Sequence, residues 1–208
     1  ERFRRVRGLR VAELGLSQGK SLRLWADFFS NDAIFHMSDT TSSNFDKVRR
    51  SLDRQVQGRV HMHSANLTIG KGAWMHPEFD WNGTVRGIAS MRGEAEKSGG
   101  FHLIVDDAGH SPLQNLMFFH ELIGVVLPGG YYVCEDLGAG GFGTIARREM
   151  TRPTLPQAIR RTPTPIDMFV NVTRTIAGKG SDSVCGGCDA GLVSAHWWLE
   201  TVLFERGA

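Results

Sequence analysis

The sequence predicts an α/β fold built on a doubly wound, mostly parallel, seven-stranded sheet of the Rossmann-like type that ends in an antiparallel hairpin. Three observations favour this fold. Short apolar runs alternate with segments of helical periodicity along most of the chain. The apolar runs have few polar interruptions, as is typical of strands covered by helices on both faces. The last two β-rich runs are separated only by Leu199-Glu200, which predicts a hairpin.

The first half of the chain supplies three of the expected strands. They are Leu9–Leu14, Ala33–Met37 and Arg59–His63. A Gly-rich turn after the first strand leads into a helix with an apolar side formed by Leu22, Trp25, Phe28 and Phe29. The second strand ends at Asp39. Apolar residues at four-residue spacing in Asn44–Val56 predict a polar helix that lies on the surface.

The second half supplies the remaining strands, which are Phe101–Val105, Tyr131–Cys134, Val193–Trp198 and Thr201–Arg206. An N-cap, a first-turn proline and a capping-box partner predict a helix after the fourth strand, at Ser111, Pro112 and Gln114. Its apolar stripe is Leu113, Leu116, Met117 and Ile123. A later helix begins at Thr164-Pro165.

Two Gly-rich segments do not fit the alternating pattern. Residues 67–100 are rich in Gly and polar residues and lie where a crossover helix belongs. Only IASMRGEAEK, residues 88–97, has a helical pattern, which predicts an insertion or a mobile loop. Gly138–Gly143 follows the fifth strand and is either an active-site lid or a plain linker. We expect one domain over residues 1–208 that contains both segments.

The composition excludes several classes of protein. With 41% hydrophobic and 22% charged residues, the chain is typical of a soluble globular protein. A net charge of +2 argues against a dedicated nucleic-acid binder, and no apolar run approaches the ~20 residues that span a membrane. Cys185 and Cys188 form a C-x-x-C without a second pair, which disfavours structural zinc. We expect a reducing compartment, the cytoplasm.

Acidic residues end the fourth and fifth strands. Asp106-Asp107 follows one buried strand, His110 lies three residues beyond, and Glu135-Asp136 follows the next strand. Since parallel strands joined by a helix end at the same edge of a sheet, these side chains should converge there. Carboxylates with an adjacent imidazole predict a divalent-metal site with a base beside it. The alternative is that the acids cap the following helix or are solvated strand ends.

The turn after the first strand has the character of a ligand site. Gly15 and Gly19 would let the backbone approach a ligand closely, and the helix that includes Ser21 offers free N–H groups. Asp39 ends the second strand, where an acid can accept both hydroxyls of a ribose. Glu13 suits a cationic amino-acid group better than a pyrophosphate. The alternative is a tight turn with a helix-capping Asp.

Several motifs together resemble a known family. They are E-L-G-x-x-x-G-x-S, V-D-D-A-G-H, P-G-G-Y-Y-V-C-E-D-L and the closing S-A-H-W-W-L-E-T-V-L-F-E-R. The chain resembles class I S-adenosylmethionine-dependent methyltransferases from Leu9 to Arg206. Within that class it is similar to the metal-dependent group that contains the macrolide-sugar O-methyltransferases and the cephalosporin hydroxylase-like proteins. The resemblance implies S-adenosylmethionine and Mg²⁺ as cofactors.

The resemblance also assigns site residues. The metal ligands it implies are Asp107, Glu135 and Asp136, and His110 matches the general base. The cofactor-binding positions are Glu13, Gly15, Gly19, Ser21, Asp39, Asn66 and Asp106. Asn66 lies where the superfamily often has an acid that binds adenine, Gly109 stands where the group prefers Ser, and Gly-Ala-Gly-Gly replaces the polar and aromatic run that often follows Leu137.

The resulting prediction is a Mg²⁺-dependent O-methyltransferase that acts on a hydroxyl of a sugar or another small molecule. Its partner is a small-molecule acceptor, with no nucleic acid and no membrane, and a homo-oligomer is left open. One alternative is a non-catalytic ligand-binding protein on the same fold. The other is an NAD(P)-dependent oxidoreductase, against which the missing G-x-G-x-x-G and the terminal hairpin argue.

Overall fold

The computed structural model describes residues 2–39, 42–64, 81–108, 112–137, 169–170, 172–173, 191–198 and 201–207. The strands are β1 (Arg10–Leu14), β2 (Ile34–Asp39), β3 (Val60–Ser64), β4 (Phe101–Asp106), β5 (Val126–Cys134), β6 (Leu192–Trp198) and β7 (Thr201–Arg206). The helices are α1 (Lys20–Phe28), α2 (Ser42–Arg50), α3 (Arg54–Gln57), α4 (Trp81–Ser98) and α5 (Pro112–Leu122), and a 3₁₀ helix spans Ile123–Val125.

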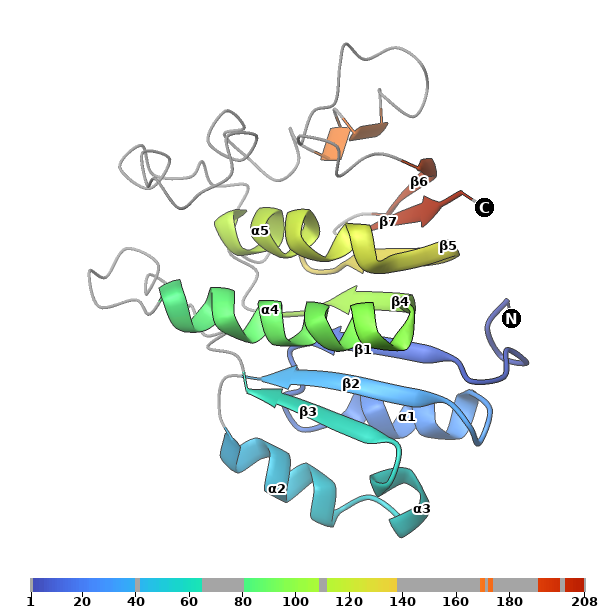
Figure 1. The fold of residues 1–208 in the computed structure, drawn as a ribbon, viewed down its shortest axis with the longest axis vertical. Coiled ribbons are helices and arrows are strands. Elements are labelled where there is room, and N and C mark those ends of the chain that lie inside the picture. The colour runs from blue at the N-terminus through green and yellow to red at the C-terminus, as the bar shows by residue number, and fades with distance from the viewer. Residues whose placement is uncertain are drawn as a thin grey trace.

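One seven-stranded sheet runs through the molecule in the order β3-β2-β1-β4-β5-β7-β6 (Figure 1). The first five strands pair in parallel, and β7 is antiparallel to both β5 and β6. This confirms the predicted α/β fold with its closing antiparallel strands.

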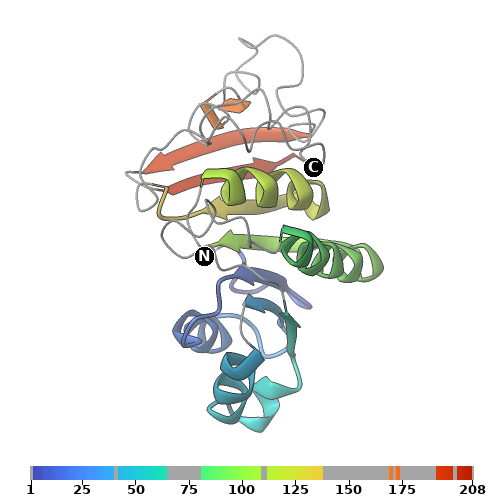
Figure 2. The ribbon, with the colours of Figure 1, turned by 90° about the vertical axis from the view of Figure 1, so that its left-hand side faces the viewer.

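Helices cover both faces of the sheet. On one face α4 and α5 lie over the strands, and α1 lies on the face opposite α4 (Figures 1 and 2). The larger apolar cluster joins α4 and α5 to the sheet and includes Met91, Leu116 and Phe119. The smaller cluster, on the other face, includes Leu22 and Val48. The sheet is therefore the middle of three layers, which explains why its strands are so apolar.

Helix α4 occupies part of the segment for which the sequence predicts an insertion or a mobile loop. It covers residues 81–98 and leads directly into β4, so it fills the place of the expected crossover helix. The buried side chains of Ile88, Met91 and Ala95 lie three and four residues apart and face the larger cluster. Burial of this stripe outweighs the low helix propensity of the three glycines in the helix. Residues 65–80 lie outside the described part of the chain.

The helices on the other face differ in detail from the prediction. In place of one helix over Asn44–Val56 there are two, because the chain turns at residues 51–53 between α2 and α3. In α1, Leu22 is buried as expected, whereas Phe28 is 42% exposed and stacks against Arg4, whose guanidinium carbon lies 5.6 Å from the ring centroid.

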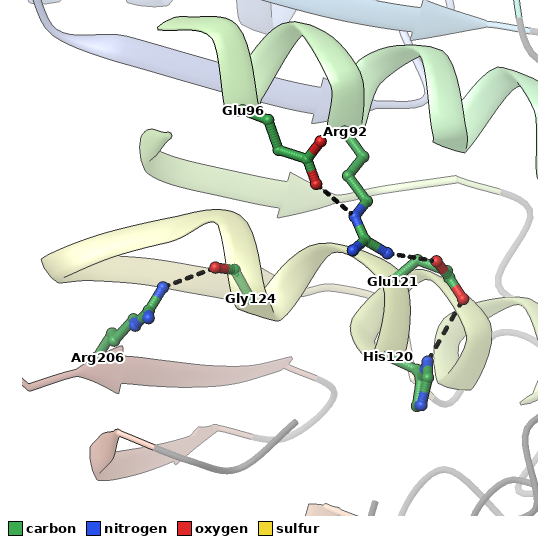
Figure 3. A network of polar contacts seen from close by, with 6 residues as sticks. All are labelled: Arg92, Glu96, His120, Glu121, Gly124 and Arg206. Atoms are coloured by element: carbon green, nitrogen blue, oxygen red, sulfur yellow. Dashed lines mark hydrogen bonds and ion pairs between the residues drawn. The ribbon is translucent and has the colours of Figure 1, made fainter. Parts of the chain in front are cut away.

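Aromatic and polar contacts join the helices to the sheet and to each other. Phe119 of α5 packs its ring at 5.0 Å from Phe204 of β7 and at 5.2 Å from Phe169, which places three buried aromatic rings together. At the surface, Arg92 of α4 pairs with Glu121 of α5 at 3.2 Å (Figure 3). Arg206 of β7 donates to the carbonyl of Gly124 at 2.8 Å, next to the end of α5 (Figure 3). None of the described helices is long and apolar enough to cross a membrane.

Candidate functional site

The strand register brings the predicted acidic tips together. Asp106 of β4 pairs with Cys134 of β5, so Asp107 and Glu135 each lie one residue beyond a paired position. The backbone N–H of Asp107 donates to the carbonyl of Leu14 at 3.0 Å, and that of Glu135 donates to the carbonyl of Asp106 at 2.9 Å. These bonds extend the ladder past the ends of the strands, so the backbone fixes both tips at one edge of the sheet.

The carboxylates at this edge influence one another electrostatically. Burial raises the pKa of Glu135, and the negative charges of Asp107 and Asp136 raise it further. Asp136 has φ 52, a left-handed conformation that Asp tolerates better than most residues. Within the described ranges, no three His, Cys, Asp or Glu side chains form a group that could hold a metal ion. That finding covers Asp107, Glu135 and Asp136, which are not grouped as metal ligands in this structure. Their side chains are nevertheless all carboxylates, the ligand type that Mg²⁺ prefers.

The turn after β1 presses against the tip of β4. Gly15 has φ +98, and a Cβ placed on it would lie 2.1 Å from the carbonyl oxygen of Asp107. The N–H groups of Gly15 and Leu16 donate to the carbonyl of Ser38 at 2.9 and 3.1 Å. The turn is thus bonded to β2 on one side and in direct contact with β4 on the other, and only glycine fits at position 15.

The next residues of the turn are held by Asp39 and by packing. The N–H of Ser17 donates to Oδ2 of Asp39 at 2.8 Å, and the Asp39 side chain is buried. Gly19 precedes α1 with φ +67, and a Cβ there would lie 2.6 Å from Cγ1 of Val48 in α2. Asp39 therefore supports the tight turn, but it does not cap α1, whose N-cap is Gly19 and has no side-chain cap bond.

Glu13 is a buried acid at the end of β1, with its side chain 1% exposed. The hydroxyl of Ser21 donates to its two carboxylate oxygens at 2.6 and 2.8 Å. Burial raises the pKa of Glu13 to about 8, the bond from Ser21 opposes this, and the charges of Asp107 and Glu135 add to it. A cation bound beside Glu13 would relieve the cost of its ionisation.

Asp106 is a buried acid at the end of β4. Its carboxylate is buried, and its Oδ2 accepts from the Tyr132 hydroxyl at 3.2 Å and from the Cys134 thiol at 3.6 Å. The Asn115 amide of α5 in turn donates to Sγ of Cys134 at 3.0 Å. Burial raises the pKa of Asp106 to about 7. The sequence placed Asp106 among the cofactor-binding residues and indicated nothing about Tyr132 or Asn115.

A second polar cluster lies on β2 and β3. Nδ1 of His36 is 3.1 Å from Nε2 of His63, and the His36 ring stacks on His61 with centroids 4.7 Å apart. Burial lowers the pKa of His36 to about 3, and the neighbouring histidines lower it further.

The structure thus brings most of the predicted site residues to one edge of the sheet. Glu13, Gly15, Asp107 and Glu135 lie at the ends of β1, β4 and β5, and Asp136 is close enough to affect Glu135. Other predicted features lie outside the described residues. These are His110, Asn66, Gly138–Gly143 and the pair Cys185 and Cys188.

Solved structures share this fold. The methyltransferase MycE from the mycinamycin biosynthetic pathway, in complex with Mg, S-adenosylhomocysteine and mycinamycin VI, matches 99% of this chain with a TM-score of 0.66 and 20% identity. The O-methyltransferase TomG from Streptomyces achromogenes, which is involved in tomaymycin synthesis and was solved with S-adenosylmethionine, matches 96% of this chain and 73% of its own, with a TM-score of 0.55 and 16% identity.

The chain spans 46% of the MycE chain, less than half of its length. No family model and no curated protein sequence matches it. The likeness is one of architecture, and it agrees with the strand order and the closing antiparallel strands described above. The chain therefore has the fold of the class I S-adenosylmethionine-dependent methyltransferases.

Proposed function

We propose that the protein is a Mg²⁺-dependent O-methyltransferase that transfers the methyl group of S-adenosylmethionine to a hydroxyl of a sugar or another small molecule. One observation carries the proposal. The Gly15 turn, with the buried acid Glu13 before it, is in direct contact with the β4 tip that bears Asp107. A site for a cationic donor and a cluster of carboxylates are thereby joined at one edge of the sheet.

The donor half of the site would be formed by the turn after β1. Glu13, oriented by Ser21, would bind the ammonium group of the methionine moiety, because an acid with a raised pKa gains most from a nearby cation. Gly15 leaves the backbone uncovered for close approach. Asp39 would bind the ribose, and the family resemblance adds Asn66 for adenine. S-adenosylmethionine supplies a methyl group on a sulfonium, which needs an aligned nucleophile.

The acceptor half would be formed by the acidic tips. Asp107, Glu135 and Asp136 would hold Mg²⁺, and their mutual repulsion is the reason that a cation is favoured among them. Bound Mg²⁺ lowers the pKa of a hydroxyl that coordinates to it. His110 would accept the hydroxyl proton, a role assigned by its position three residues after Asp107.

Calorimetry of the purified chain tests the proposal without knowledge of the acceptor. We expect S-adenosylmethionine to bind, and we expect Mg²⁺ binding that Asp107→Asn weakens at least ~10-fold while donor binding stays within ~2-fold. Asp27→Asn is the matched control, because Asp27 is an exposed acid on α1, and it should change neither. Absence of donor binding would reject the methyltransferase and favour a binding protein or an oxidoreductase.

A chain that binds the donor can then be tested for transfer. Production of S-adenosylhomocysteine would be followed with a panel of sugars and other small hydroxyl compounds, with Mg²⁺ and with EDTA. Transfer that EDTA leaves unchanged would contradict the metal-dependent mechanism. Donor binding without transfer to any compound, despite bound Mg²⁺, would favour the non-catalytic alternative.

A further inference from the structure

Four buried polar side chains form a connected network directly beneath the acidic edge. The members are Asp106, Tyr132, Cys134 and Asn115, all 3% exposed or less. Asp106 is the common acceptor for the Tyr132 hydroxyl and the Cys134 thiol, and Asn115 donates to the same thiol. The network connects β4, β5 and α5, the three elements whose relative position decides where the two acidic tips lie.

Two of the four members stand next to a proposed metal ligand along the chain. Asp106 immediately precedes Asp107, and Cys134 immediately precedes Glu135. A backbone hydrogen bond also joins the two strand ends, since the N–H of Glu135 donates to the carbonyl of Asp106 at 2.9 Å. A shift or rotation at Asp106 or Cys134 would therefore move a carboxylate of the edge, although both of these side chains are buried.

The hydrogen bonds of the network lie among apolar side chains. Its neighbours in the larger core cluster are apolar, among them Ile104, Leu116 and Phe119. Apolar packing tolerates small sliding between strands, whereas a hydrogen bond is lost when its partners move apart or rotate. Breaking one leaves a buried polar group unsatisfied, at a cost that opposes such movement. Within the register that the backbone ladder sets, these contacts are therefore suited to fixing the orientation of the residues beside the two strand tips.

We infer that Asp106, Tyr132, Cys134 and Asn115 are positioning residues that set the separation and orientation of the Asp107 and Glu135 carboxylates for a divalent cation. The inference rests on the proposed function, because it assumes that the edge binds a metal. None of the four is itself a ligand. Each acts through the backbone of the residue beside it or through another member of the network.

Substitution of adjacent tyrosines tests the inference with a matched control. Tyr132→Phe removes only the hydroxyl that bonds to Asp106. Tyr131→Phe makes the same change one residue earlier, where the hydroxyl accepts a bond from Arg2 at the surface. Loss of a group bonded directly to a metal ligand costs ~10- to 100-fold in metal affinity. Because Tyr132 acts through Asp106 and the backbone, we expect Tyr132→Phe to weaken Mn²⁺ binding less, by up to ~10-fold. Tyr131→Phe should leave it unchanged.

Mn²⁺ is the probe because its binding is measured directly by electron paramagnetic resonance, without an acceptor. Cys134→Ser and Cys134→Ala form a second pair. Serine keeps a donor to Asp106 and an acceptor for Asn115, and should stay within ~2-fold of the wild type, whereas alanine should weaken binding as Tyr132→Phe does. All variants should keep donor affinity within ~2-fold, measured by calorimetry with S-adenosylmethionine.

The outcomes separate the inference from the proposed function. If the wild type binds S-adenosylmethionine and Mn²⁺, but Tyr132→Phe and Cys134→Ala lower only the melting temperature, the network is merely structural and the inference is overturned. If the wild type binds no S-adenosylmethionine, the proposed function fails on its own measurement. If it binds the donor and no Mn²⁺, the inference falls together with the metal-dependent part of the proposal.

Discussion

The contact between the β1 turn and the β4 tip leads to a quantitative prediction for Gly15→Ala. The added Cβ would lie 2.1 Å from the Asp107 carbonyl oxygen, more than 1 Å short of the 3.4 Å at which ordinary contact begins. That oxygen belongs to the backbone and cannot rotate away. The N–H of Asp107 is bonded to Leu14, so relief requires that the ends of β1 and β4 separate.

Two terms set the magnitude. An alanine at φ +98 is strained by ~1–3 kcal/mol, and overpacking against a fixed neighbour adds ~1–3 kcal/mol. We therefore expect Gly15→Ala to lower the free energy of unfolding by ~2–6 kcal/mol. Because the shift separates the two halves of the proposed site, the affinity for S-adenosylmethionine should fall with it.

Two other glycines isolate these terms. Gly8 has φ +59 with no atom within 4 Å of an added Cβ, so Gly8→Ala carries strain alone, ~1–2 kcal/mol. Gly93 lies within α4, also with open space, so Gly93→Ala should stabilise the protein by ~0.5–1 kcal/mol. Urea denaturation followed by tryptophan fluorescence measures all three. A Gly15→Ala protein no less stable than Gly8→Ala would refute the reasoning.

Three further predictions concern pH and packing. Acidification from pH 7 to 5 should lower the free energy of unfolding by up to ~2 kcal/mol through His36. The pKa of His36 is about 3 in the folded protein and near 6.5 in the unfolded chain, so in this pH range only the unfolded chain binds the proton. Denaturation of His36→Leu should show a smaller pH dependence, and an equal one would contradict this. Binding of S-adenosylmethionine at pH 7 should release a proton from Glu13, because its pKa is about 8 and a bound cation favours the ionised carboxylate. Calorimetry in buffers of different ionisation enthalpy measures this release. The Glu13→Gln variant should release no proton. Phe204→Ala should cost ~3–5 kcal/mol in urea denaturation because it empties a fully buried site, whereas Val193→Ala, at a 55% exposed position, should stay within ~0.5 kcal/mol.

The acidic edge could be predicted from the sequence because it depends on strand ends alone. Asp107 and Glu135 each follow an apolar run of strand length, and parallel strands joined by a helix end on the same side. No knowledge of side-chain packing was needed. For the same reason the Gly15 turn was predictable, since it stands between a strand and the start of a helix.

The network beneath the edge could not be predicted in this way. Tyr132 and Cys134 reach Asp106 only because β4 and β5 pair in one register, and a shift by one residue would turn both side chains to the other face. Helix α4 was predicted only in part, over residues 88–97, for a different reason. Its glycines reduce helix propensity, and the burial of Met91 and Ala95 that compensates arises only once the sheet has formed.

The position of β7 between β5 and β6 has a consequence for the order of assembly during synthesis. The ribosome completes β6 first, yet in the described sheet β6 is bonded only to β7, which follows it. Until residue 206 has left the ribosome, β6 lacks its neighbour and β5 keeps an open edge that other chains can join. The strand that carries Glu135 at its end is therefore enclosed last. A nascent chain stalled before residue 201 should be prone to aggregate, although β1 to β5 are already made.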